Sequence, residues 1–421
     1  MKRIAPGFVA LCLLGLAGPA TAATLKVAPE PAATLLLPYF AVDYSSTDGS
    51  GQNTLFSINN ASDQPVLAHV VVWSDLSVPV LGFNIYLTGY DVQTLNLWNL
   101  LRNGLLPSTA SAGQDPSDTI SPKGSFSQDI DFPSCNGLLP PPTLPADFVA
   151  HLQASLSGRA STVFGGLCAG RNLGDNVARG YVTVDTVNNC TLRFPGDSGY
   201  FAADGSGDAT NQNVLWGDYF YINSAANLAE ANTLVHILFE EPPPPSSVSF
   251  SAPYTFYGRY VSWSGADKRH PLATSFGVRF LNGGPFSGGT DLIVWRDSKT
   301  NQGPFTCPAQ SGRPSWFPLS QEGIVVFDEQ EHPYVPQNPF SPFPAEAQSV
   351  NVGGANFPVP FSFGWVYLNL NNTVFTETGP PNTAQAWVTV KMTSQGRFSV
   401  GFDAIQIDNA SRPRHQTPGP P

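Results

Sequence analysis

Hydrophobic residues recur at every second position in many short segments of this chain, and turn-forming residues separate the segments. Thr54 to Asn59 alternates, with Phe56 and Ile58 on one face, and Val66 to Trp73 is a β-branched run. Such segments follow one another at a spacing of roughly 8–12 residues, which is typical of β-sandwiches and barrels. Because no helical pattern separates them, we expect antiparallel pairing, since parallel strands need long crossover connections.

The same pattern predicts strands along both halves of the chain. The expected strands are 54–59, 66–73, 82–88, 91–97, 180–187, 219–222 and 233–239 in the first half, and 255–263, 275–281, 291–295, 323–327, 364–370, 386–393 and 397–402 in the second.

One short helix is expected at 145–156. Proline is tolerated in the first helical turn, Leu152 and Leu156 share a face, and Gly158 stands where a C-terminal cap belongs. The stretches 103–147 and 331–360 are predicted to be long loops, because prolines and other turn-forming residues are frequent in them.

These elements predict an all-β fold, namely an antiparallel β-sandwich, immunoglobulin-like or jelly-roll-like, with two lobes, long loops and one short helix. Four consecutive prolines begin a Pro-rich connection at 242–249. This connection separates an N-terminal β lobe, residues 23–241, from a C-terminal β lobe, residues 250–411. Residues 412–421 are polar and Pro-rich and are predicted to form a disordered tail.

The first 22 residues have the pattern of a signal peptide. Lys2 and Arg3 precede a short apolar run at 8–16, and Ala20-Thr21-Ala22 is a small-x-small cleavage site. The apolar run is too short to cross a bilayer, which needs about 20 residues, and no later segment approaches that length. We therefore predict a mature protein that begins at Ala23, has no membrane span, and is secreted or periplasmic.

Composition narrows the class of protein further. Hydrophobic residues make up 42% of the chain and charged residues only 12%, about half the usual charged content. A large core is therefore possible, and wholesale disorder or a coiled coil is excluded. Without the signal peptide the chain has 18 basic and 31 acidic residues, and it has no basic cluster, so nucleic acid is not an expected partner.

Four cysteines lie outside the signal peptide: Cys135, Cys168, Cys190 and Cys307. Their wide spacing argues against zinc, and an even number in an exported chain predicts two disulfides. Spacing allows three pairings, of which we favour Cys135–Cys168 with Cys190–Cys307. Three cysteines precede the four prolines and one follows them, so one bridge must join the two halves into one body.

An acidic loop is a candidate calcium site. Asp204, Ser206 and Asp208 alternate with glycines, which matches the start of an EF-hand loop. Ala209 and Leu215 depart from that motif at its sixth and twelfth positions, so an irregular calcium site or a solvated turn remain the two interpretations.

Two further patterns could indicate catalysis. Gly196–Gly199 reads GDSG, the tetrapeptide around the nucleophile of trypsin-like proteases, but Tyr200 follows where a further glycine would normally stand. His69 and His236 lie in the middle of predicted strands, where a histidine could act as a base or bind a metal. Each pattern is also typical of an ordinary turn or of a buried core histidine.

Carbohydrate chemistry is the main alternative to simple binding. The acidic residues Asp328, Glu329 and Glu331 follow a predicted strand and could supply the carboxylate pair of a glycoside hydrolase, or form a solvated turn. Exposed aromatic rings could cover sugar faces, although most aromatic residues are expected in the core. The candidate aromatics are Trp216, Tyr219, Tyr221, Tyr257, Tyr260, Trp263 and Trp316.

The sequence thus favours an exported, non-catalytic β-sandwich protein that acts through its surface, as an adhesion, envelope or extracellular matrix component. The alternative is a carbohydrate-binding or carbohydrate-active protein that uses loop carboxylates and exposed aromatics. The expected partner is an extracellular protein or a glycan, and calcium is the only cofactor that the sequence suggests.

Overall fold

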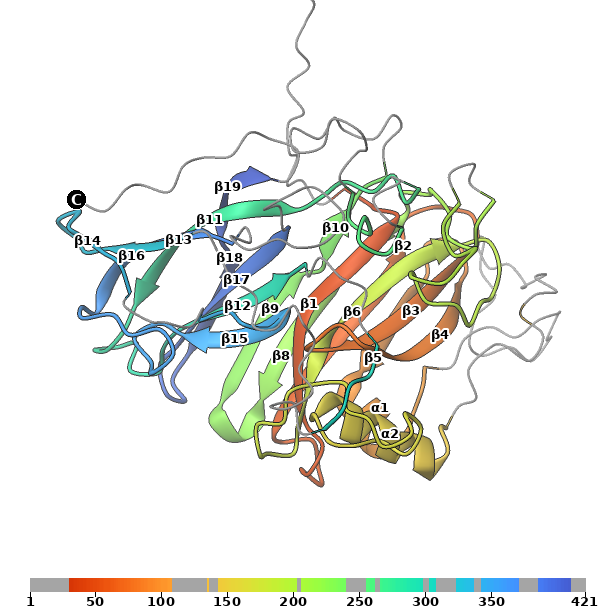
Figure 1. The fold of residues 1–421 in the computed structure, drawn as a ribbon, viewed down its shortest axis with the longest axis horizontal. Coiled ribbons are helices and arrows are strands. Elements are labelled where there is room, and N and C mark those ends of the chain that lie inside the picture. Colours follow the sequence, from red (N-terminus) through yellow and green to blue (C-terminus); the bar gives the residue numbers. More distant parts are fainter. Residues whose placement is uncertain are drawn as a thin grey trace, which may run out of the picture.

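The protein is described here by a computed structural model (Figure 1). It describes residues 30–107, 135, 143–202, 206–239, 255–261, 266–297, 303–307, 323–336, 342–370 and 385–409. Every strand pair in this part of the chain is antiparallel, and the strands form four sheets, which confirms the all-β sandwich-like class. The predicted signal peptide, Pro-rich connection and tail lie outside the described residues.

The strands of the first half form two sheets. Sheet A has the order β5-β2-β8-β9, with β7 also paired to β2, and sheet B has the order β10-β1-β6-β3-β4. Their strands are β1 (Thr34–Asp43), β2 (Gln52–Asn60), β3 (Val66–Ser74), β4 (Pro79–Leu87), β5 (Val92–Asn96), β6 (Val177–Val187), β7 (Leu215–Trp216), β8 (Asp218–Asn223), β9 (Leu228–Thr233) and β10 (Val235–Ile237).

The strands of the second half form two further sheets. Sheet C has the order β15-β12-β17-β18, and sheet D has the order β14-β13-β16-β11-β19. Their strands are β11 (Ala273–Leu281), β12 (Gly289–Arg296), β13 (Gly323–Phe327), β14 (Pro333–Tyr334), β15 (Ala347–Asn351), β16 (Phe363–Asn369), β17 (Ala386–Thr393), β18 (Ser399–Asp403) and β19 (Ile405–Asn409).

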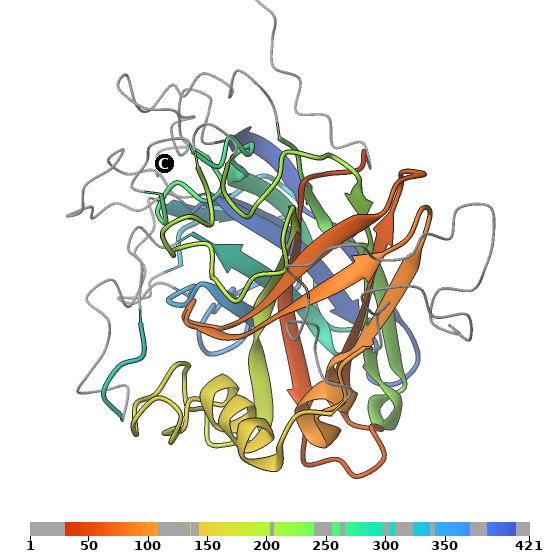
Figure 2. The same cartoon turned by 90° about the vertical axis from the view of Figure 1, so that its right-hand side faces the viewer.

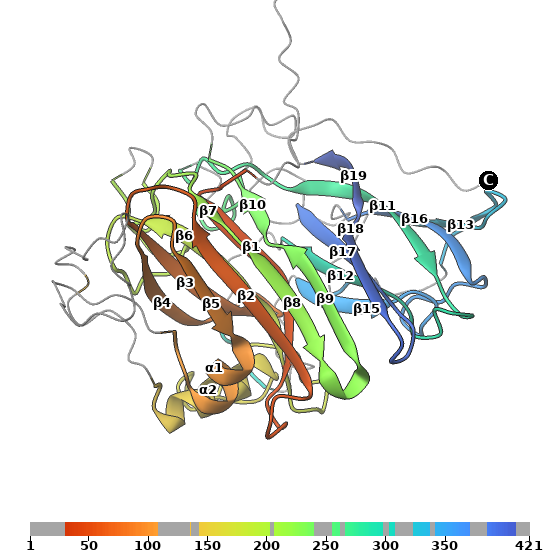
Figure 3. The ribbon, with the colours of Figure 1, turned by 180° about the vertical axis from the view of Figure 1, so that it is seen from behind.

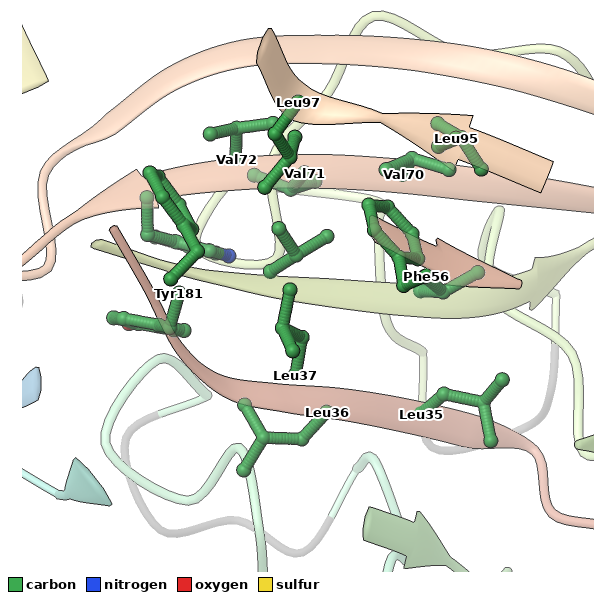
Figure 4. Close-up of a cluster of buried hydrophobic side chains, with 14 of the residues drawn as sticks. Leu35, Leu36, Leu37, Phe56, Val70, Val71, Val72, Leu95, Leu97 and Tyr181 are labelled. Carbon is green, nitrogen blue, oxygen red and sulfur yellow. The ribbon is translucent and has the colours of Figure 1, made fainter. Parts of the chain in front are cut away.

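Sheets A and B pack face to face around the larger core. Figure 4 shows side chains from several strands meeting there, among them Leu37 of β1, Phe56 of β2, Val70 of β3 and Leu95 of β5. All four are almost fully buried. Burial of this apolar area is the main force that holds the two sheets together.

Sheet C has two buried faces. Leu292 and Val294 of β12 join the smaller core with sheet D, whereas the alternate residues Ile293 and Trp295 join the core of sheets A and B. Alternation of side chains along a strand explains how one strand serves two cores. The two halves therefore share a core, and Figure 3 shows β9 of sheet A lying beside the strands of sheet C.

Strand β1 lies in the middle of sheet B, although no strand was predicted at its position. Its sequence contains Pro38, which cannot donate a ladder hydrogen bond and normally argues against a central strand. The structure accommodates it at an irregularity, because the register between β1 and β6 shifts between Leu37 and Phe40. The strand predicted at 255–263 is wrong, since residues 256–261 form turns.

Two helices lie together at one end of sheets A and B (Figure 2). Helix α2 (Ala146–Leu156) matches the predicted helix almost residue for residue. Helix α1 (Leu97–Asn103) was not predicted, although Asn96 caps its N-terminus and Gly104 ends it with a positive φ of 69°. The predicted loop at 331–360 also contains the edge strand β15, which pairs with β12.

The disulfides are present, but the favoured pairing is wrong. Cys135 is bonded to Cys190 and Cys168 to Cys307. The second bridge joins the two halves of the chain, as the distribution of cysteines requires. Sequence spacing could not choose between the pairings, because the choice depends on which loops meet in space.

Non-reducing peptide mapping should therefore recover one linked pair with Cys135 and Cys190 and another with Cys168 and Cys307. Reduction before digestion is the control and should separate both pairs. Recovery of a Cys135–Cys168 peptide would contradict this arrangement.

Candidate binding surface

Within the described part of the chain, no other sheet covers the outer face of sheet A. Along β2 and β8, Phe56 and Tyr219 point into the core, while their neighbours Leu55 and Phe220 point outwards. Leu55 and Phe220 are direct cross-strand partners. Sheet D covers sheet C in the second half, but it does not extend over sheet A, whose outer face is the one turned to the viewer in Figure 3.

A groove of about 410 Å³ opens on this face between sheet A and helix α1. Leu97, Leu105 and Leu106 supply much of its apolar wall, and Thr94 and Asp218 supply polar groups on its floor. A concave, mainly apolar site with a few polar groups is the usual form of a ligand site.

The N-terminal cap of α1 positions one wall of the groove. The Asn96 side chain accepts hydrogen bonds from the backbone N–H groups of Trp98 and Asn99 at 3.0 and 3.3 Å. This cap starts the helix directly at the end of β5, so the helix turns back over the sheet. Leu97 and Leu100 are buried against the sandwich, which holds the helix in place.

Asp218 is the single titratable side chain among the described residues that line the groove. Its Oδ1 accepts a hydrogen bond from the Ser57 hydroxyl at 2.6 Å, and its backbone N–H donates to the same hydroxyl at 3.2 Å. The described lining therefore offers no second titratable group that could act with Asp218 as an acid–base pair.

The predicted calcium loop is only partly described. Asp204 lies outside the described residues, whereas Ser206 and Asp208 lie within them. Asp208 Oδ2 accepts a hydrogen bond from Thr191 Oγ1 at 2.7 Å and forms an ion pair with Arg193 at 3.1 Å. Among the described residues no group of three or more His, Cys, Asp or Glu side chains could hold a metal ion. The calcium site stays a prediction, and calcium would have to compete with Arg193.

Calcium at ten times its dissociation constant is expected to stabilise the protein by about 1.4 kcal/mol. That corresponds to a rise in melting temperature of a few degrees. Arg193→Ala should enlarge the rise, because it removes the competing cation, and Asp208→Ala should abolish it. Melting curves of the wild type and both variants, recorded in calcium and in chelator, test this expectation. If each of the three proteins melts at the same temperature in both buffers, the loop is a solvated turn.

The GDSG tetrapeptide forms a turn. Asp197 Oδ2 accepts a hydrogen bond from the backbone N–H of Phe194 at 2.7 Å, which closes that turn. Within the described part of the chain no histidine hydrogen-bonds to Ser198. The arrangement therefore lacks the base that a serine nucleophile needs.

The two strand histidines do not meet. His69 lies on β3 and His236 on β10, and two strands of sheet B separate them, a distance of roughly 14 Å. His69 is fully buried and donates to Asn84 Oδ1 at 2.9 Å, and burial lowers its pKa. His236 donates to the backbone carbonyl of Glu30. Both are structural residues.

His151 and Ser161 resemble a nucleophile and its base, a pair that the sequence did not suggest. Ser161 Oγ lies 2.6 Å from Nδ1 of His151, whose Nε2 lies 3.3 Å from the carbonyl of Val80. Both side chains are buried, and neither lines the groove. We assign this pair the structural role of attaching α2 to β4.

The acidic residues after β13 form a turn. Asp328 accepts hydrogen bonds from the backbone N–H groups of Gln330 and His332 at 2.8 and 2.9 Å. The hydrogen bonds from His332 and Gln330 lower the pKa of Asp328. Such a carboxylate caps a turn and is already engaged by the backbone.

The candidate aromatics divide between core and surface. Tyr219, Tyr221 and Tyr257 are buried, as expected for most of them, and Tyr260 is half-buried. Trp216 is exposed on the outer face of sheet A. The remaining two candidates, Trp263 and Trp316, lie outside the described residues.

A buried ion network, not predicted from the sequence, lies in the second half of the chain and reaches the first half through neutral hydrogen bonds of Arg259. The Arg259 guanidinium pairs with Glu346 and, at 3.3 Å, with Asp297, and all three side chains are almost fully buried. It also donates to Ser77 Oγ at 3.0 Å and to the Tyr260 hydroxyl at 2.6 Å. Burial opposes the charged form of Arg259, but the carboxylates raise its pKa well above its usual value. None of these residues lines the groove beside α1.

A second buried charge lies where β9 meets β18. Glu230 is buried, and neither carboxylate oxygen accepts a hydrogen bond from the described residues. It packs against Gly401, where an added Cβ would lie 2.0 Å from Oε1 of Glu230. Burial raises the pKa of Glu230 to about 7, and Lys391 opposes this shift. Charged residues are few in this chain, so the position of Glu230 among uncharged residues is the one feature of the sequence that could have indicated a buried carboxylate.

Comparison of the chain with protein-family models, with curated proteins and with solved structures finds no match. The fold and the surface therefore define the class directly: an all-β, disulfide-bonded, sandwich-like protein with an open groove on one sheet. Neither described helix is long and apolar enough to cross a membrane.

Proposed function

We propose that this is an exported, non-catalytic β-sandwich protein that acts through its surface, as an adhesion, envelope or extracellular matrix component. Its binding surface is the outer face of sheet A together with the groove beside α1. The groove, on a face that no other sheet of the described part of the chain covers, is the observation that carries the proposal. Two disulfides support an oxidising, extracytoplasmic location.

The chemistry of the groove favours binding over catalysis. Glycoside hydrolysis needs two carboxyl groups about 5–9 Å apart, and Asp218 is the single carboxylate among the described lining residues. The acidic turn at Asp328 belongs to sheet D, in the other half of the molecule. Of the two carbohydrate functions considered as the alternative, the groove therefore favours carbohydrate binding over carbohydrate hydrolysis.

Leu55→Asp tests the proposal, because it places a charge on the groove floor while the core residues of β2 stay unchanged. Ile405→Asp is the matched control, since Ile405 is an exposed aliphatic residue in the other half. Binding of the purified proteins to immobilised matrix proteins and cell-wall polysaccharides should fall at least about tenfold for Leu55→Asp and stay unchanged for Ile405→Asp. Equal binding by Leu55→Asp and the wild type would contradict the proposal.

A further inference from the structure

We infer that the outer face of sheet A binds a neutral oligosaccharide along the row Trp216, Asp218 and Phe220. The inference rests on the proposed function, because it assigns a ligand class to the same surface. Three features carry it: the position of two exposed rings, a carboxylate oxygen between them that accepts no hydrogen bond from the described residues, and the lack of cationic groups among the described residues that line the groove.

The two rings lie on consecutive strands, β7 and β8, which both pair with β2 and are separated only by Gly217. Leu215 and Tyr219 point into the core, and the alternate residues Trp216 and Phe220 point outwards with 42% and 40% of their surface exposed. Four residue steps of extended chain separate the rings by roughly 13 Å. Two exposed rings at this spacing exceed the size of one monosaccharide, so the ligand is a chain of sugars.

Gly217 keeps this row close to the rest of the sheet. A Cβ at this position would lie 2.2 Å from the backbone oxygen of Ser57. Glycine therefore allows β7 and β8 to approach β2, and the rings stand directly beside the polar side chains of β2 and β5.

Asp218 supplies a hydrogen-bond acceptor between the rings. Ser57 occupies its Oδ1, and no described residue donates a hydrogen bond to Oδ2. The exposed Thr94 lies opposite Ser57 on β5 and adds a hydroxyl to the same floor. Hydroxyl groups of a sugar can donate to the carboxylate oxygen while the apolar C–H face of the sugar covers a ring.

Other ligand classes fit this surface less well. A purely apolar ligand would remove water from Asp218 without replacing its hydrogen bonds. An anionic ligand would meet the Asp218 carboxylate, and the described residues that line the groove at Asp218 and Phe220 include no Lys, Arg or His. A neutral, hydroxyl-rich ligand with apolar faces satisfies both the rings and the acceptor.

Affinity electrophoresis in gels that contain soluble neutral polysaccharides, such as xylan, β-glucan or galactomannan, tests the inference. The wild type should be retarded by at least one of them. Trp216→Ala, Phe220→Ala and Asp218→Ala should each weaken binding about tenfold or more, and Trp216→Tyr should restore much of it because the ring returns. Phe398→Ala is the matched control, since Phe398 is a similarly exposed aromatic in the second half.

The outcomes separate this inference from the proposed function. Absence of retardation in every neutral polysaccharide, or retardation that survives both ring variants, would overturn the oligosaccharide assignment. Binding to a matrix protein that Leu55→Asp abolishes and Trp216→Ala leaves intact would overturn it too, while supporting the proposed function. Melting temperatures of the two ring variants should match that of the wild type, because both rings are exposed, whereas Asp218→Ala should lower it slightly because it removes the hydrogen bond from Ser57.

Discussion

Arg259→Met is expected to destabilise the folded protein by about 3–5 kcal/mol, since it removes one partner from a buried ion network. Glu346 and Asp297 would then remain buried without their counter-charge. Methionine fills a similar volume, so the loss would come from electrostatics and hydrogen bonds more than from packing. Because Arg259 also donates a hydrogen bond to Ser77 of the first half, the loss should appear in the cooperative unfolding of the whole body.

Urea unfolding of the oxidised protein measures this loss, with Arg193→Met as the control. The Arg193 side chain is 52% exposed in its ion pair with Asp208, so its removal should cost at most about 1 kcal/mol. Adding Glu346→Leu to Arg259→Met should recover part of the stability, because it removes one of the stranded charges. A loss for Arg259→Met no larger than that of the control would show that the buried network does not stabilise the fold.

Glu230→Gln is expected to reduce the pH dependence of stability. The pKa of Glu230 is about 7 in the folded protein and 4.5 ordinarily, so its ionisation removes about 3 kcal/mol of stability between pH 4 and pH 8. Desolvation is the main cause, because no described residue donates a hydrogen bond to either carboxylate oxygen. The nearby Asp291 adds to the shift, and Lys391 reduces it.

The direction follows from proton binding in the two states. Below pH 4.5 the Glu230 carboxyl is protonated in both the folded and the unfolded chain, so it carries no ionisation penalty. Between pH 4.5 and 7 the unfolded chain releases this proton and the folded protein keeps it, so the free energy of unfolding falls as pH rises. Above pH 7 the loss is complete.

The free energy of unfolding of Glu230→Gln minus that of the wild type should therefore rise by about 3 kcal/mol from pH 4 to pH 8. Glutamine does not titrate, so any constant cost of burying its amide cancels in this comparison. Glu329→Gln, at an exposed turn, is the control and should show no such rise. A constant difference for Glu230→Gln across this pH range would mean that Glu230 is already hydrated in the folded protein.

The strands and the fold class could be predicted from local pattern. Alternation marked strands such as β13, whose predicted limits match the structure, and Gly158 beyond the Leu152 and Leu156 repeat marked α2. These signals are local, since they depend only on neighbours within one or two turns of the chain. Strand β1 escaped prediction because Pro38 breaks the local rule and only its pairing with β6 restores it.

Most residues of the proposed binding surface could not be recognised from the sequence, because their exposure depends on tertiary contacts. Trp216 and Tyr219 have similar sequence surroundings, but one is exposed and the other buried, because sheet B covers only the inner face of sheet A. The sequence marked Trp216 as a candidate and missed Asp218 and Phe220, whose importance comes from the strand beside them.

By itself, the sequence determined the all-β class, because residue alternation is a local property of the chain. The number and distribution of its cysteines also predicted two disulfides, one of them between the halves. The tertiary structure alone decided which cysteines pair, which charges are buried and which sheet face stays open. Cys168 and Cys307 are 139 residues apart, and Arg259 and Glu346 are 87 residues apart. Contacts at such distances are set by the packing of whole sheets, and no local pattern in the chain encodes them.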